Sequence, residues 1–175
     1  MLLQKGYLIT IGETLGLSQR GGSVMSHVRA SKRETLPPLI PEGLCDLVLA
    51  LEPIEGLRIL GSYGHPDVLT ITNTRPIMPM DVLAGQAEYP ELEVVLEKMN
   101  ELSRRVWTVD ATDLALKMGD PILANVIMLG ALGGLKILPY DVRTFETAIR
   151  EFFPDDRLTT NLEAFNQGRT SVKAI

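Results

Sequence analysis

Alternating apolar and polar positions predict two short strands near the start of the chain. Tyr7 to Ile11 is β-prone, and Ser23 to Arg29 repeats with a period of two. Val24 and Val28 share one face of the second strand. We therefore expect His27, on the opposite face, to be exposed.

The middle of the chain alternates predicted strands with predicted helices. Strands are expected at residues 44–51, 68–72 and 106–110, and the first of these is a nearly continuous apolar run, typical of a strand covered on both faces. Helices are expected from Pro53 to about Leu60 and along the apolar stripe from Leu92 to Leu102. This order predicts an α/β fold, a three-layer sandwich with a mostly parallel sheet.

The last third of the chain is predicted to be helical. Asp120 and Pro121 form a helix start, because a carboxylate can cap the first turn and proline fits the first helical position. The apolar run 122–135 is shorter than the roughly 20 residues of a membrane span and predicts a buried core helix. An amphipathic helix is expected over 142–152, and a last short one over "NLEAFNQG".

Composition and charge exclude several classes of protein. The 175 residues, 45% hydrophobic, fit one domain spanning 1–175. The net charge of −5 argues against a nucleic-acid partner, which a basic surface would mark. We find no secretory signal and no membrane segment, so we expect a cytoplasmic protein.

Residues for self-contained catalysis are scarce. Cys45 is the only cysteine, which excludes an internal disulfide and is too few for an iron–sulfur cluster. It lies in an apolar strand and is expected to be a buried, unreactive thiol. His27 and His65 have no carboxylate companion at metal-ligand spacing. An independent hydrolase or transferase is therefore disfavoured.

The stretch "GLSQRGGSVMSHVR" places two glycines directly after a cation. One interpretation is a tight turn before a strand. The other is an anion site, in which backbone N–H groups form a concavity and an arginine adds a forked donor. The residues concerned are Ser18, Gln19, Arg20, Gly21, Gly22 and Ser23.

Three polar residues each follow or end a predicted strand: Glu52, Asn73 and Asp110. In open α/β sheets, ligands bind at the carboxyl ends of the strands, so these residues mark the expected working surface. Helix capping and turn hydrogen bonds are the alternative interpretation of the same residues.

Four ordered motifs carry a resemblance that spans nearly the whole chain from about Gly6. They are "GLSQRGGSVMSHVR", "LIPEGLCDLVLALEPIEGLR", "VDATDLALKMGDPILANVIMLGALGGL" and "NLEAFNQGR". Together they resemble the gamma-type domain of 2-oxoacid:ferredoxin oxidoreductases, and the forms SQRGGSV, IPEG and LALEP are most similar to its indolepyruvate branch.

The resemblance implies a non-catalytic subunit of a complex that oxidatively decarboxylates an arylpyruvate, with coenzyme A as co-substrate and ferredoxin as electron acceptor. It implies that this chain alone holds no cofactor, and that a larger partner subunit carries thiamine diphosphate and iron–sulfur clusters. Ser18 to Ser23 would face the partner's active site, with Arg20 as the anionic or interfacial contact. Glu52, Asn73 and Asp110 complete the candidate cofactor-binding residues.

The sequence departs from the family at its start. The family begins with a strand, a G-x-G-G-Q-G loop and a helix, and the printed sequence starts inside or after that helix. We expect either a truncated start or a homo-oligomer that pairs the exposed sheet edge. The rival hypothesis is a stand-alone small-molecule-binding or self-associating scaffold protein of the same fold.

Overall fold

The computed structural model describes residues 1–15 and 24–175 as an α/β arrangement. Most of the predicted elements are present. The elements in chain order are η1 (Leu3–Lys5), β1 (Leu8–Leu15), β2 (Val24–Ser31), β3 (Leu47–Ala50), α1 (Pro53–Tyr63), β4 (Leu69–Asn73), α2 (Met80–Leu83), α3 (Leu92–Leu102), β5 (Arg105–Val109), α4 (Ala111–Lys117), η2 (Pro121–Leu123), α5 (Ala124–Gly134), α6 (Val142–Phe152), α7 (Asp155–Thr170) and β6 (Lys173–Ala174).

The main sheet has the strand order β3-β4-β5-β6. β3, β4 and β5 are parallel, with Val48 opposite Thr70 and Thr72 opposite Thr108. The short β6 runs antiparallel to β5, so the sheet is mostly parallel, as predicted. From Thr70 to Asn73, β4 is fully buried, as expected of a central strand covered on both faces.

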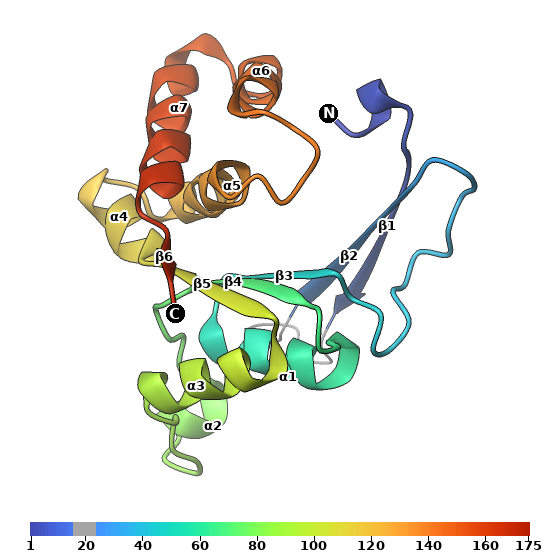
Figure 1. Cartoon of the computed structure of the whole chain (residues 1–175). Helices are drawn as coiled ribbons and strands as arrows, with labels where there is room; N and C mark the ends of the chain where they lie inside the picture. The colour runs from blue at the N-terminus through green and yellow to red at the C-terminus, as the bar shows by residue number, and fades with distance from the viewer. Residues whose placement is uncertain (16–23) are drawn as a thin grey trace.

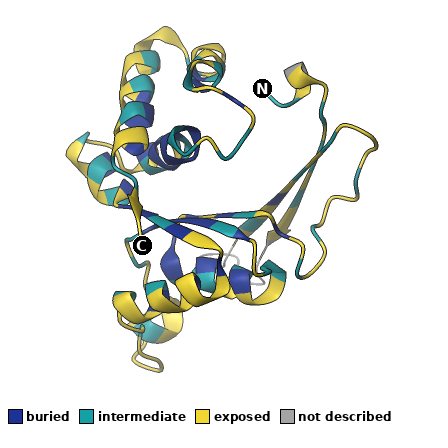
Figure 2. Ribbon diagram, in the orientation of Figure 1, coloured by how far each residue is buried: buried dark blue, intermediate teal, exposed yellow. Residues whose placement is uncertain are grey.

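Helices cover both faces of this sheet and make three layers (Figure 1). α1 and α3 pack on one face, where one apolar core includes Val48, Leu60 and Met99. α4, α5 and α7 lie on the other face, over a second core that includes Ile71 and Ile127. Figure 2 shows buried residues along the parallel strands and on the inner sides of α5 and α7, whereas β6 is exposed.

Local capping explains where several helices begin. The Glu52 side chain accepts a hydrogen bond from the Glu55 N–H, and Pro53 occupies the first position of α1. The predicted start at Asp120 is confirmed, because its carboxylate accepts from the Ile122 N–H at 2.9 Å. That start opens the short η2, which continues into α5.

Most of the apolar run 122–135 forms α5, the buried helix that was predicted, with Ile127, Met128 and Ala131 almost fully inaccessible. Ile122 belongs to η2 and is exposed. No helix in the described part of the chain is long and apolar enough to cross a membrane.

The first two strands form a separate antiparallel hairpin (Figure 1), and His27 of β2 contacts Tyr63 of α1. The expectation that His27 is exposed was wrong: it is 2% exposed, whereas Val24 and Val28 are 63% and 55% exposed. The Ile40 N–H donates to His27 Nδ1 at 3.2 Å, and the ring meets Tyr63 edge to face at 5.4 Å. The histidine face of β2 is therefore the one that packs on the body of the protein.

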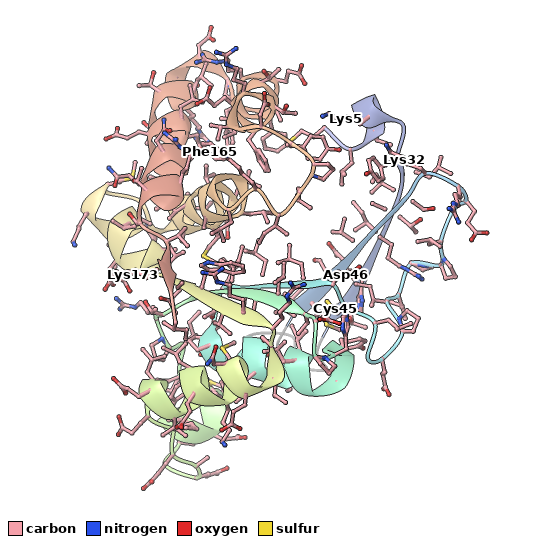
Figure 3. All side chains as sticks on the ribbon, viewed as in Figure 1. Lys5, Lys32, Cys45, Asp46, Phe165 and Lys173 are labelled. Carbon is pink, nitrogen blue, oxygen red and sulfur yellow. The ribbon has the colours of Figure 1, made fainter. Side chains whose placement is uncertain are left out.

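Four short elements were not predicted, namely η1, α2, α4 and β6, and α7 is longer than expected. The amphipathic stripe of α7 is weak, but the helix extends over Asp155–Thr170 because it packs along α5. Its Phe165, labelled in Figure 3, stacks on Phe145 of α6 at 5.7 Å between ring centres.

The crossing of α5 and α7 brings two backbones into contact. A Cβ on Gly168 would lie 1.8 Å from the Ile127 carbonyl oxygen, and one on Gly130 would lie 2.0 Å from the Phe165 carbonyl oxygen. These distances are far below van der Waals contact, and the obstacle is backbone rather than a movable side chain. Only glycine fits at either position.

We predict that Gly168→Ala destabilises the protein by at least about 1–3 kcal/mol, the usual effect of overpacking a core, because α7 must move away from α5. Gly61→Ala is the matched control, because Gly61 is an exposed residue of α1 and a Cβ added to it would meet nothing within 4 Å. The control should be neutral or slightly stabilising. Urea unfolding of both variants measures the difference, and equal midpoints would contradict the close crossing.

Candidate functional site

The candidate residues Glu52, Asn73 and Asp110 all lie at the carboxyl edge of the parallel strands. Glu52 follows β3, Asn73 ends β4 and Asp110 follows β5. Hydrogen bonds connect the three strand ends. The Asn73 amide donates to the Leu51 carbonyl at 3.0 Å, and the Thr74 hydroxyl donates to Asp110 at 2.5 Å. The structure therefore assembles this edge from the residues that the sequence indicated.

Glu52 is a buried carboxylate, 7% exposed. Its Oε2 accepts from the Glu55 N–H at 2.8 Å, and its Oε1 accepts from the Tyr89 hydroxyl and from the Ile77 N–H at 3.4 Å. Burial, and then the hydrogen bond to this carboxylate, raise the pKa of the Tyr89 phenol. Glu52 thus caps α1 and fixes the segment that follows β4.

Asn73 joins β3, β4 and α4. Its amide nitrogen donates to Leu51 and also to the Thr112 hydroxyl at 2.9 Å, and its Oδ1 accepts from the Thr112 N–H at 3.3 Å. Asn73 is 2% exposed, so its polar atoms are used inside the protein. It supplies a cap to α4 from the neighbouring strand, since the Asp110 side chain makes no capping bond there.

The Asp110 carboxylate lies at the surface between β4 and β6. Its Oδ1 accepts from Thr74, and the Lys173 ammonium lies 3.5 Å from its Oδ2. These contacts, led by the hydrogen bond from Thr74, lower the pKa of Asp110. Lys173, labelled in Figure 3, comes from β6 at the end of the chain.

A shallow pocket of about 260 Å³ lies beside Asp110. Its lining consists of Asp110, Asp113, Leu114, Lys117, Ser171 and Lys173. The volume is below the roughly 300–1,000 Å³ of typical ligand sites, and four of the six lining residues are charged. The pocket alone does not support a small-molecule-binding protein.

Ser18, Gln19, Arg20, Gly21, Gly22 and Ser23 lie outside the described residues, so both interpretations of that stretch stay predictions. Contact of Glu52, Asn73 and Asp110 with a cofactor also stays a prediction. Their observed hydrogen bonds are those of the capping and turn alternative.

The remaining titratable candidates, Cys45 and His65, form hydrogen bonds with the backbone of neighbouring residues. Cys45 is 6% exposed and donates to the Leu47 carbonyl at 3.2 Å, and burial raises the pKa of its thiol. The predicted burial is confirmed, although Cys45 lies just before β3 and not within it. His65 lies in the loop before β4 and accepts from the Asp67 N–H. Within residues 1–15 and 24–175, no three histidine, cysteine or acidic side chains are grouped to hold a metal ion.

Sequence reasoning missed the partners of the candidate residues. Tyr89 is 37 positions from Glu52 and Thr112 is 39 positions from Asn73, so no local spacing connects them. Lys173 reaches Asp110 only because the two-residue β6 returns to β5. Asp113 and Lys117 both line the pocket beside Asp110, and their spacing of four on α4 could have suggested that they share one helix face.

Comparison with known proteins places the chain among oxidoreductase subunits. The sequence profile of the family described as pyruvate ferredoxin/flavodoxin oxidoreductase matches residues 1–171. The chain is 39% identical to the indolepyruvate oxidoreductase subunit IorB of Archaeoglobus fulgidus over 95% of this chain and 81% of that protein. It is 35% identical to the subunit of the same name from Pyrococcus horikoshii, over 99% of this chain and 85% of that protein.

Solved structures share the fold at lower identity. A pyruvate oxidoreductase subunit from Thermotoga maritima aligns with a TM-score of 0.65 and 22% identity, covering 99% of this chain and 84% of that chain. A 2-oxoglutarate:ferredoxin oxidoreductase from Magnetococcus marinus, solved with 2-oxoglutarate, coenzyme A and succinyl-CoA bound, also aligns with a TM-score of 0.65. Its identity is 19%, over 96% of this chain and 26% of that chain.

We predict that the Cys45 thiol does not react with a thiol-specific dye in the native protein, because it is buried and its thiolate is disfavoured. In denaturant, one thiol per chain should react rapidly, since the sequence has a single cysteine. Reaction of the native protein at the rate of the unfolded chain would contradict this.

We predict that Asp110 contributes to acid sensitivity. Because its pKa is lowered in the folded state, its contribution is present above the ordinary aspartate value, about 3.9, and is lost as pH falls through the folded value. Asp110→Asn should therefore lose less unfolding free energy than wild type between about pH 5 and pH 2. The difference should be below about 1 kcal/mol, since the Asp110–Lys173 pair is exposed.

Urea unfolding at several pH values measures this effect. Thr74→Ala should act in the same direction because it removes the main hydrogen bond to Asp110, whereas Thr74→Ser keeps the hydroxyl and should behave as wild type. Identical pH profiles for wild type and Asp110→Asn would overturn the assignment.

Proposed function

Since the chain belongs to the pyruvate ferredoxin/flavodoxin oxidoreductase family, we propose that it is the non-catalytic subunit of an indolepyruvate-type 2-oxoacid:ferredoxin oxidoreductase. The observation that carries this is the similarity to indolepyruvate oxidoreductase subunits, at up to 39% identity over almost the whole chain. In the proposed reaction an arylpyruvate loses carbon dioxide, its acyl group passes to the thiol of coenzyme A, and the released electrons pass to ferredoxin.

The residues of this chain do not fit the redox groups of that reaction. An iron–sulfur cluster is normally held by several thiolates, and the one cysteine is buried with its thiol bonded to Leu47. We therefore assign the clusters to a larger partner subunit. The same subunit would hold thiamine diphosphate, the cofactor that stabilises the carbanion left when a 2-oxoacid loses carbon dioxide. The cytoplasm is the proposed location of the complex.

The role left to this chain is to contact that partner and coenzyme A. Ser18 to Ser23, with Arg20, is the proposed contact segment. Glu52, Asn73 and Asp110 belong to the same proposal, as residues of the carboxyl edge. Their hydrogen bonds hold the ends of β3, β4 and β5 in fixed relation, which supports such a role.

Self-association is the alternative, and the sheet offers one observation in its favour. Within the described sheet, β3 has a neighbour on one side only, and a free edge can pair with a second copy. Gel filtration of the isolated chain and of a co-expressed mixture with the larger subunit separates the two cases. A stable complex with the larger subunit supports the proposed function, and a homo-oligomer that excludes this subunit contradicts it.

Arg20→Ala should weaken assembly with the larger subunit, or reduce coenzyme A-dependent ferredoxin reduction by about tenfold, which is the loss of roughly one charge-assisted hydrogen bond. The fold should be unaffected. Arg150 is an exposed residue of α6, so Arg150→Ala is the matched control and should behave as wild type. Unchanged turnover and unchanged association of Arg20→Ala at limiting subunit concentration would refute the contact role.

A further inference from the structure

The excess negative charge of the chain is concentrated in one segment. Residues 76–97 contain no lysine or arginine and five carboxylates, which equals the net charge of −5 of the whole chain. The rest of the molecule is therefore electrically balanced. All five side chains are exposed, and they are Asp81, Glu88, Glu91, Glu93 and Glu97.

The same segment exposes large apolar side chains. Ile77, Met80 and Leu83 are 65%, 67% and 67% exposed, and Met78 is 44% exposed. They come from the loop after β4 and from α2, which Figure 2 shows as almost entirely exposed. Together with the five carboxylates, these four residues define what we call the 77–97 surface. Methionine side chains adapt their shape to a partner, so such a surface suits protein contact.

Glu52 holds the 77–97 surface in place. Its Oε1 accepts both from the Ile77 N–H and from the Tyr89 hydroxyl. Ile77 and Tyr89, 12 positions apart, are thus both held by the Oε1 atom of the buried Glu52, and α2 lies between them in the sequence. α3 begins at Leu92, only three residues after Tyr89, so the apolar residues and the first glutamates of α3 belong to one region. Binding there would require little ordering of the chain.

Within the described residues, none of the five carboxylates of this surface forms an ion pair. The nearest cation along α3, Lys98, is paired with Glu101 at 2.8 Å. Glu93 and Glu97 are four apart on α3, a spacing at which like charges destabilise a helix. A cationic partner would remove this repulsion.

We propose that the 77–97 surface docks a basic face of the larger subunit, on which apolar side chains are surrounded by lysine and arginine. This rests on the proposed function, because it takes that subunit as the partner. Charge complementarity selects the occupant. A second copy would bring five carboxylates against five in a symmetric contact, and nucleic acids and anionic membranes would also be repelled.

The test measures binding of the purified larger subunit to variants of the full chain at several salt concentrations. Met80→Ser/Leu83→Ser removes apolar area from two positions that are 67% exposed, and Glu88→Gln/Glu91→Gln/Glu93→Gln removes charge from exposed positions, so neither variant should unfold the protein. We expect each to raise the dissociation constant at least tenfold, and the glutamine variant also to flatten its dependence on salt. Phe152→Ser, 80% exposed on α6, and Glu34→Gln/Glu42→Gln/Glu151→Gln are the matched controls.

The outcomes separate the two proposals. If wild type and both variants bind the larger subunit equally well, the docking proposal is overturned and the proposed function stands. If wild type does not bind that subunit, both fail. If the variants instead abolish a homodimer of the isolated chain, the occupant is a second copy and the docking proposal is also overturned.

Discussion

The contact between the backbones of α5 and α7 is the constraint on which the rest of the structure depends. Gly168 and Gly130 each face a carbonyl of the other helix, so the two helices cross at one separation only. α7 then delivers the chain to β6, whose pairing with β5 places Lys173 beside Asp110. The position of Lys173 at the carboxyl edge of the sheet therefore depends on a crossing that lies in another layer.

Glu52 is a second fixed point, at the opposite side of the same edge. A buried carboxylate is tolerated only where hydrogen bonds replace water, and Glu52 has three donors. Its role is to join the first turn of α1 to the long connection after β4. Asn73 does the same between β3 and α4. Polar residues at the strand ends thus hold the loops at this edge of the sheet in place.

The sequence predicted the features that local patterns control. The alternation of strands and helices from β3 to β5, and the starts of α1 and η2, follow from periodicity and from side chains within three residues. The prediction that His27 is exposed was wrong because alternation shows only that the two faces of a strand differ. Which face packs depends on the contacts of His27 with Ile40 and Tyr63. The Tyr89–Glu52 contact and the pairing of β6 with β5 were not predicted, because both join residues that are far apart in the sequence.

The β1–β2 hairpin is a unit that can unfold separately from the main sheet. Its strands bond to each other and not to the four-stranded sheet, and its contact with α1 is the packing of His27 on Tyr63. The bonds of Arg29 to the Pro37 and Leu39 carbonyls lie within the connection that follows β2. Detaching it breaks no ladder of the main sheet. Amide protons of the hairpin and of β4 should accordingly exchange as two separate cooperative units, with the hairpin the less protected.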